Sequence, residues 1–282
     1  MGMQINTNTA ANNAYRNLNN TQNALSKSLE KLSSGLRINR AADDAAGLSI
    51  SEGLRSQISG NKVAARNAQD GISVIQTSEG ALTEVHNILH RMRDLAVQGG
   101  NDSNNADSRA AIKGEADALG EELTRIIDNT NFNGIKLLDG STKSFQVGTG
   151  DNTSSSDVID VKLSGTAASV GGLATAAGTA SADFVVTDSA TASGTITKID
   201  AAITAISTDR ATLGAAQNRF ESTINSLSVA GENLAAAESR IRDTDMASEM
   251  VNYTRASILS QAGTSMLAQA NQSNQSVLKL LG

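Results

Sequence analysis

The most regular pattern of apolar positions in the chain lies between Ile199 and Ile241, where apolar residues recur in alternating steps of four and three. One of the two series has no exception: Ile206, Leu213, Phe220, Leu227, Leu234 and Ile241. The other series contains Arg210 and Gln217, which are too polar for a closed two-stranded coiled coil. The pattern therefore predicts a long helix whose apolar seam meets several neighbours in a bundle.

Similar spacing predicts three further long helices. One runs from Asn12 to Ser33 and ends at Gly35, since glycine is a common helix stop. Its apolar stripe consists of Ala14, Leu18, Thr21, Leu25, Ser28 and Leu32. A second helix is expected from about Asp44 to Val97, and a third from Met246 to Gln272. On the third, Leu259, Ala262, Met266 and Gln269 share one face.

The middle of the chain follows different patterns. After residue 100, a loop rich in Asn, Asp and Ser leads to a helix with its seam at Ile112, Ala116, Leu119, Leu123 and Ile126. Asn133-Gly134 and Asp139-Gly140 are strong turn signals. Short strands are expected at Lys143–Val147, Val158–Leu163 and Asp183–Thr187. Residues 141–197 are dominated by Thr, Ser, Gly, Ala and Asp. The expected fold is mainly α, with a small β-hairpin region in the middle of the chain.

Composition supports a helical body rather than a compact core. The 282 residues include no Pro, Cys or Trp, and only 2 Tyr and 4 Phe, although 39% are hydrophobic. The apolar residues are chiefly aliphatic, the set that packs between long helices. A net charge of −6 argues against nucleic acid as the main partner. No apolar run is long enough to predict membrane insertion.

The beginning of the sequence has no apolar run of the length that a secretory signal needs, so by itself it points to a cytoplasmic protein. The lack of cysteine is neutral, since it suits a reducing cytosol and equally a chain that leaves the cell unfolded.

Candidate metal chemistry is limited to His86 and His90, whose spacing of four lets two imidazoles bind one zinc. The zinc-protease pattern would need Glu at position 87, where this chain has Asn87, and no third ligand is evident. The favoured interpretation is two histidines on a helix surface beside Arg91 and Arg93. No metal site is predicted.

Other catalytic patterns are equally weak. The glycines at 148 and 150 have neither the third glycine nor the following helix of a phosphate-binding loop. Asp43 and Asp44 are better explained, with Arg37 and Arg40, as a charged turn at a helix start than as an acid–base pair. The sequence therefore predicts no enzyme and no cofactor.

Five strings of the sequence closely resemble bacterial flagellin, the subunit of the flagellar filament. They are KLSSGLRINRAADDAAGLSISEGLRSQI (31–58), QDGISVIQTSEGALTEVHNILHRMRDLAVQ (69–98), TNFNGIKLLDG (130–140), LGAAQNRFESTINSLSVAGENLAAAESRIRDTDMASEM (213–250) and ILSQAGTSMLAQANQ (258–272). The resemblance covers both ends of the chain in the same order, whereas residues 141–197 carry no match and correspond to the variable segment of that family.

The resemblance implies a long antiparallel helical coiled coil or bundle formed by both termini. Residues 1–43 with 243–282 are expected to form an inner coiled-coil core domain, and 44–140 with 198–242 a rod-like helical domain. Residues 141–197 are then a short, partly β segment. Leu18, Leu25, Leu32, Leu259, Met266, Leu280 and Leu281 are the expected subunit-packing residues.

The resemblance also implies that the protein is exported and works outside the cell. The chain would leave unfolded through the flagellum-specific type III export channel and polymerise with copies of itself at the filament tip for swimming motility. The implied partners are an export chaperone, the filament cap protein and the hook–filament junction proteins. Marginal helices at both ends suit a protein that orders on assembly. Secretion to the extracellular filament thereby replaces the cytoplasmic expectation.

A receptor site is implied by one further match. Flagellins recognised by Toll-like receptor 5 carry an Arg and a Leu in an RxRxLAxQ-like string and a Glu on the next helix. RMRDLAVQ supplies Arg91 and Leu95, and KGEAD supplies Glu115. Asp94 stands where that pattern commonly has Glu. Without the resemblance, Arg91 and Glu115 would be read as a solvated ion pair of little energetic weight.

Two alternatives stay open from the sequence. The chain could be a coiled-coil binding protein or adhesin that does not polymerise, or a hook-associated junction protein. The latter are usually longer and match the terminal strings less completely.

Overall fold

The computed structural model describes residues 8–150, 157–162, 170, 173 and 183–281, with side chains as far as 272. The helices are α1 (Thr9–Ser34), α2 (Ala45–Gly99), α3 (Ala106–Asn129), α5 (Ser189–Arg242) and α6 (Met246–Leu281). The strands are β1 (Asn131–Phe132), β2 (Ile135–Lys136), β3 (Thr142–Gln146) and β4 (Val158–Lys162). The expected mainly α fold with a small β region is confirmed. None of the described helices has an apolar stretch long enough to cross a bilayer.

Contacts divide the chain into two compact units. Unit 1 holds residues 1–58 and 232–282, and unit 2 holds residues 59–231, so that α2 and α5 contribute to both. These limits lie inside the long helices. The sequence predicted domain limits at residues 43 and 243. Both positions lie in the breaks between helices, one between Ser34 and Ala45 and the other between Arg242 and Met246. These limits stay a prediction.

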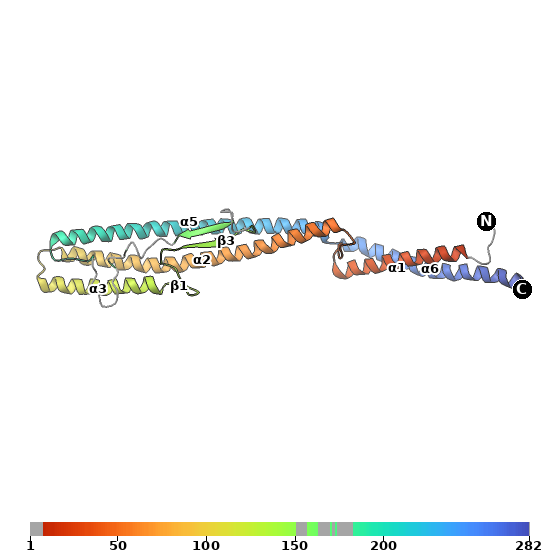
Figure 1. Ribbon diagram of the computed structural model, residues 1–282, viewed down its shortest axis with the longest axis horizontal. Coiled ribbons are helices and arrows are strands. Elements are labelled where there is room, and N and C mark those ends of the chain that lie inside the picture. The colour runs from red at the N-terminus through yellow and green to blue at the C-terminus, as the bar shows by residue number, and fades with distance from the viewer. Residues whose placement is uncertain (1–7, 151–156, 163–169, 171–172, 174–182, 282) are drawn as a thin grey trace. The chain divides into compact units, whose positions relative to one another are not determined.

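In unit 2, α2, α3 and α5 lie side by side (Figure 1). The predicted seam of α5 is buried at Ile206, Leu213 and Phe220. Ala202 and Ala216 are buried as well, which widens the apolar face beyond a two-helix seam. This agrees with the expectation that α5 meets several neighbours, because a wide stripe can pack against more than one helix.

One of the two turn signals of the sequence forms the turn of a β-hairpin, and the other, Asp139-Gly140, lies just before β3. β1 and β2 pair across a two-residue turn at Asn133 and Gly134, and both residues have positive φ, as the hairpin turn requires. β3 and β4 form a separate antiparallel pair. Phe145 of β3 packs edge-on against Phe220 of α5, with ring centres 5.5 Å apart. The hairpin is thereby joined to the helical core of unit 2.

The strand expected at Asp183–Thr187 is wrong. Phe184 and Val186 of this segment are buried in the core, but the described residues give it no strand partner. Its backbone is held from the side instead, because Val185 donates its N–H to the hydroxyl of Thr195 at 3.1 Å. The alternation of apolar residues correctly predicted which side chains are buried. The segment is held against α5, however, and not within a sheet.

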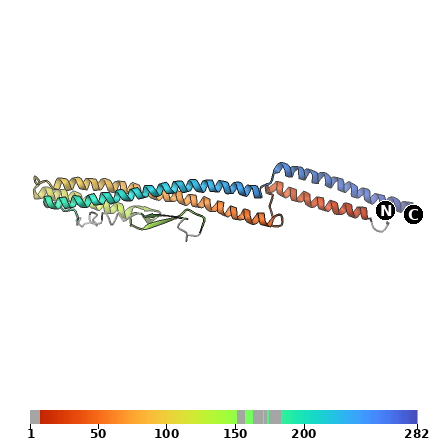
Figure 2. The ribbon, with the colours of Figure 1, turned by 90° about the horizontal axis from the view of Figure 1, so that it is seen from above.

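Unit 1 pairs the two ends of the chain. α1 and α6 pack along each other in antiparallel directions (Figure 2). The Asn8 amide donates to the carbonyl of Ala270 at one end, and Leu36 bridges to Asp243 at the other. α1 ends at Gly35 in the left-handed conformation, as the sequence indicated. The antiparallel pairing of the termini is therefore confirmed.

The two units differ in how much apolar surface they bury. The large core cluster of buried apolar residues lies wholly within unit 2. Among the described residues of unit 1, the buried apolar side chains are Ile38 and Ala256 alone. Because hydrophobic burial is the main driving force of folding, unit 1 has much less stability of its own than unit 2.

We expect this difference to be visible in amide hydrogen exchange of the monomer. The amides of α1 and α6 should exchange much faster than those of the α2 and α5 segments in unit 2, because local opening is easiest where few apolar contacts are lost. Comparable protection in both units would contradict the burial argument.

A pair of glycines on α2 tests the packing against Phe220. A Cβ at Gly71 would lie 2.8 Å from the Phe220 ring, whereas one at Gly80 would meet nothing within 4 Å. Gly71→Ala should lower the free energy of unfolding by about 1–3 kcal/mol through overpacking. The control Gly80→Ala should raise it by about 0.5–1 kcal/mol, because alanine favours the helix. Urea unfolding measures both, and equal effects would refute the close contact.

Candidate functional site

The most unusual surface of the molecule is a row of large apolar side chains on α6 that water can reach. The row consists of Met246, Met250, Val251, Ile258, Leu259 and Met266. Ile258 is 61% exposed and Met266 is 64% exposed. Single exposed apolar residues are ordinary, but a contiguous group on one helix marks an interaction site. We call these six residues the α6 row.

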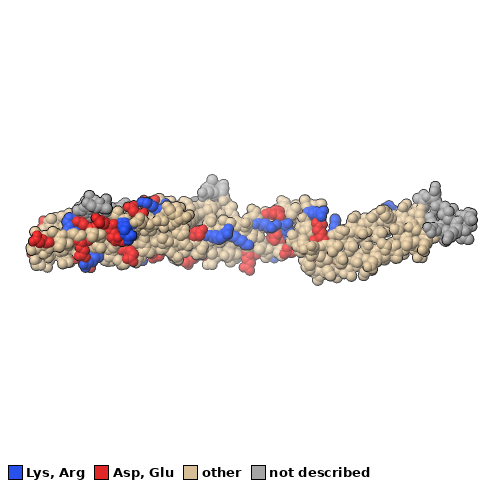
Figure 3. All heavy atoms as spheres, turned by 90° about the horizontal axis from the view of Figure 1, so that it is seen from below, with Lys and Arg blue, Asp and Glu red and all other residues tan. Residues whose placement is uncertain are grey.

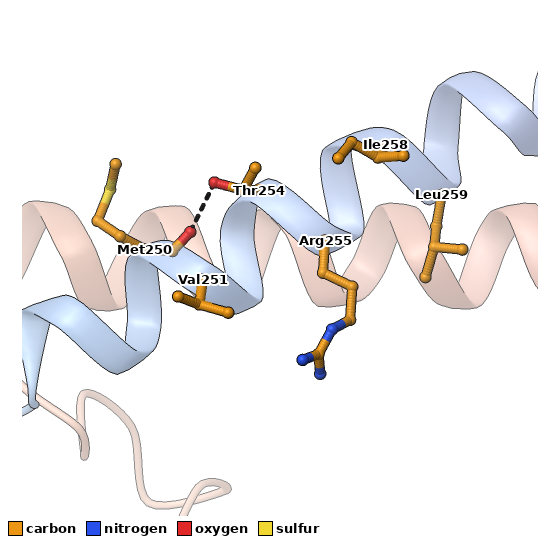
Figure 4. A pocket seen from close by; sticks show the side chains of 6 residues that line it. All are labelled: Met250, Val251, Thr254, Arg255, Ile258 and Leu259. Atoms are coloured by element: carbon orange, nitrogen blue, oxygen red, sulfur yellow. Dashed lines mark hydrogen bonds between the residues drawn. The ribbon is translucent and has the colours of Figure 1, made fainter.

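Part of the row borders a shallow groove of about 470 Å³ (Figure 4). Met250, Thr254 and Ile258 lie along one edge of the α6 ribbon, and Val251, Arg255 and Leu259 lie along the other. The Thr254 hydroxyl donates to the Met250 carbonyl at 2.8 Å, so its polar group is satisfied within the helix. Arg255 is the one charged side chain lining the groove.

Charge is sparse on this part of unit 1. Figure 3 shows a face of the α1–α6 pair on which hardly any acidic or basic side chains are visible, whereas they are frequent on unit 2 in the same view. Where exposed apolar side chains such as those of the α6 row meet few charges, burial against another surface is favourable.

The α6 row is exposed because another stripe of α6 forms the main contact with α1, although Leu259 also borders a groove that α1 lines with Ala24. That stripe is built largely of small and polar residues, including Ala256, Ser260, Gly263 and Ala270, which are all less exposed than the row. A Cβ at Gly263 would lie 3.3 Å from Leu18 Cδ1, which shows how closely the two helices approach. The small residues let α1 approach closely, and Tyr253 and Leu267 are also partly covered, whereas the six residues of the α6 row stay exposed.

The structure places the expected subunit-packing residues in two different settings. Leu18, Leu25 and Leu32 are half-buried on the stripe of α1 that packs along α6, so they make contacts within the chain. Leu259 and Met266 belong to the exposed α6 row. Leu280 and Leu281 have side chains outside the described residues.

The expected receptor residues are only partly brought together at the surface. The Arg91 guanidinium of α2 donates two hydrogen bonds, of 2.9 and 2.6 Å, to one carboxylate oxygen of Glu115 on α3. Both side chains are about half exposed. Leu95 is 1% exposed and belongs to the core of unit 2. Arg91 and Glu115 are therefore available at the surface of the chain, and Leu95 supports the helix beneath them.

A network of polar contacts joins the segment that follows α1 to the segment that precedes α6. Arg37 donates its backbone N–H to the Arg242 carbonyl, and Thr244 donates to the Gly35 carbonyl at 3.0 Å. The Arg242 guanidinium binds Glu52 and holds the pKa of that carboxyl below its usual range. This network fixes the passage from the terminal helices into α2 and α5 within unit 1.

The predicted charged turn at the start of α2 is a set of backbone caps. The Asp43 carboxylate accepts the N–H groups of Arg40 and Asn39, and the bond from Arg40 is the main reason for its lowered pKa. Asp44 accepts the N–H of Gly47 at 2.9 Å, as a helix cap does. Both carboxylates thus have structural roles at the helix start.

The histidine pair is closer than its spacing alone requires. The Nε2 atoms of His86 and His90 lie 2.9 Å apart, and the rings are nearly perpendicular with centres 4.5 Å apart. Partial burial lowers the pKa of His86, and the charges of His90 and of Arg210 on α5 lower it further. Among the described residues, no group of three or more candidate ligands surrounds a metal position.

The glycine turn around residue 148 is occupied by a side chain of the protein. A Cβ added to Gly148 or Gly150 would lie 2.0 Å from a carboxylate oxygen of Asp157. An anionic side chain therefore packs where an anionic phosphate would have to bind.

The sequence did not single out Met250, Val251 or Ile258, which are central to the α6 row. Their positions interleave with the seam toward α1, so that α6 shows no single periodic stripe. The size of the residues gives a partial signal, because most of the covered positions of α6 are small residues, with Tyr253 and Leu267 as exceptions.

Comparisons with known proteins agree with these features. Residues 5–143 match the model of the bacterial flagellin N-terminal helical region, and residues 196–281 match that of the C-terminal helical region. A flagellin of Halalkalibacterium halodurans is 52% identical over 279 residues, covering 99% of this chain and 100% of that relative. A flagellin of Bacillus subtilis is 48% identical over 307 residues, with the same coverage.

Two further similarities extend this set. The flagellar filament 33 kDa core protein of Treponema phagedenis is 46% identical over 288 residues, covering 99% of this chain and 100% of that relative. A crystal structure of Bacillus cereus flagellin is 34% identical and covers 61% of this chain and 94% of that structure, with a TM-score of 0.49.

Both terminal regions match the same family, and relatives at about half identity are covered along their whole length. The chain therefore belongs to the bacterial flagellin family of structural proteins, the subunits of the flagellar filament.

Proposed function

We propose that this chain polymerises with copies of itself through the α6 row, and that unit 1 becomes fully ordered only in the filament. The observation that carries the proposal is the contrast within unit 1, which buries few apolar side chains but exposes six large ones on α6. Neighbouring copies would supply the missing core. Contacts that repeat without closing produce an open helical fibre.

Export in an unfolded state is part of the same proposal. The chain has no cysteine that could form a wrong disulfide and no proline that could slow folding by isomerisation. A chain of this kind refolds readily after passage through the flagellum-specific type III channel. The proposed partners on this route are an export chaperone, the filament cap protein and the hook–filament junction proteins, and the destination is the extracellular filament.

Recognition by Toll-like receptor 5 is a further part of the proposal. It is supported by Arg91 and Glu115, which the structure presents as a half-exposed ion pair shared between α2 and α3. An arginine with a fixed fork of donors is a frequent anchor at protein interfaces. Leu95 would act by holding α2 in place rather than by direct contact, because its side chain is buried.

The assembly proposal predicts that Ile258→Asn prevents polymerisation at concentrations where the unmodified chain forms fibres. Burying such a side chain contributes about 1.5–3 kcal/mol, so its loss should raise the critical concentration at least about tenfold. Val229→Asn is the matched control, since Val229 is also helical, apolar and 60% exposed but lies in unit 2. Sedimentation and negative-stain microscopy after seeding measure the outcome.

In that experiment the circular dichroism of both monomers should match that of the unmodified chain. Fibres of Ile258→Asn at the normal critical concentration would contradict the role of the α6 row. Monomers of the unmodified chain that persist under all seeding and salt conditions would instead favour a coiled-coil binding protein that does not polymerise.

The receptor proposal predicts that Arg91→Ala lowers signalling through Toll-like receptor 5 at least about tenfold, as loss of an interface anchor does. Arg125→Ala is the control, because Arg125 is 62% exposed and pairs with Glu122 on α3 in a comparable way. Reporter cells treated with monomeric protein give the readout. Equal potency of the two variants would show that the Arg91–Glu115 pair is only a solvated surface contact.

A further inference from the structure

We propose that His86 and His90 form a two-imidazole site on α2 for a divalent transition metal that prefers square-planar or tetragonal coordination, Cu²⁺ or Ni²⁺. The proposal does not depend on the assembly of the chain. It rests on the geometry of the two rings and on the charges around them.

The distances between the rings fit a metal bound at a right angle. Two nitrogen ligands about 2.05 Å from a metal lie about 2.9 Å apart at 90°, but about 3.3 Å apart in a tetrahedron. The observed separation of the Nε2 atoms is 2.9 Å. Copper and nickel favour the right angle, whereas zinc favours the tetrahedron.

The ring centres give a second criterion. Imidazole centres lie about 3.2 Å from a metal bound at Nε2, which places two such centres about 4.5 Å apart at a right angle. A straight hydrogen bond between the same nitrogens would hold the centres about 5.2 Å apart. The observed distance is 4.5 Å, with the rings at 77° to each other. The two Nε2 atoms form an N–H···N hydrogen bond, and the short distance between the ring centres shows that this bond is bent. A metal that replaces the shared proton can therefore lie beside both nitrogens.

The positive charges near the pair are individually compensated. Arg210 of α5, which acts electrostatically on His86, lies 3.5 Å from the Glu79 carboxylate of α2. Arg91 pairs with Glu115 at 2.6 Å, and Arg93 pairs with Asp200 at 2.7 Å. Each of the three guanidinium groups thus has a carboxylate partner, and Arg210 is the one whose charge still opposes a cation at His86.

The site has two protein ligands, and water would complete the coordination. The Nδ1 atom of His86 is buried without a hydrogen-bond partner among the described residues. Histidine ligands usually donate this second N–H to a neighbour, and losing such support weakens metal binding about 10–100-fold. We therefore expect affinity well below that of closed structural metal sites. The other ring, His90, is exposed, so a metal can reach the pair from water.

Titration of the full-length monomer with Cu²⁺ or Ni²⁺ tests the proposal, and the chain is well suited to it because it contains only 2 histidines. We expect one Cu²⁺ per chain, with electron paramagnetic resonance showing coupling to two imidazole nitrogens. His90→Gln should weaken binding at least about tenfold, because one of two chelating ligands is lost.

The matched control keeps two histidines but separates them. In His90→Gln combined with Asp94→His, the two imidazoles stand eight residues apart, about 12 Å along the helix, and cannot share a metal. This variant should bind as weakly as His90→Gln alone. Binding as tight as that of the unmodified chain in either variant, or coupling to a single imidazole in the unmodified chain, would overturn the proposal. Circular dichroism confirms that the variants are folded.

Discussion

The apolar seam that α5 presents to α2 and α3 is the interaction on which the rest of the described structure depends. Phe220 is the clearest example of this packing. Its ring is fully buried, lies against Gly71 of α2 and packs edge-on with Phe145 of β3. One side chain thus joins two helices and a hairpin. The same packing of α5 on α2 brings together the partners of the ion pairs Arg93–Asp200 and Arg210–Glu79.

The sequence predicted this seam well because its period is unambiguous. Ile206, Leu213 and Phe220 repeat at seven-residue spacing, and the Asn133-Gly134 turn has a backbone requirement that few other residues meet. The strand at Asp183–Thr187 failed for a physical reason, since alternation reports which residues are buried but not what buries them. Within the described part of the chain, its backbone partner is the hydroxyl of Thr195 rather than a strand.

The candidate sites were less predictable for two reasons. The α6 row interleaves with a seam of small residues, so periodicity alone does not show which face is free. Leu259 and Met266 were placed on one helix face by their spacing and given a packing role by the family resemblance, whereas Ile258 became evident only from its exposure. The sequence shows that the histidines are four residues apart. It does not determine the side-chain conformations that bring the Nε2 atoms of His86 and His90 to 2.9 Å from each other.

Because unit 1 buries few apolar residues, one free energy of unfolding does not describe the stability of the whole chain. A segment that completes its core with other copies of the chain has a folding equilibrium that includes protomer concentration, by mass action. Unfolding of the dilute monomer then reports chiefly on unit 2, and no single melting temperature describes the whole chain. In the proposed assembly, the free energy that orders α1 and α6 belongs to the fibre and grows with the concentration of subunits.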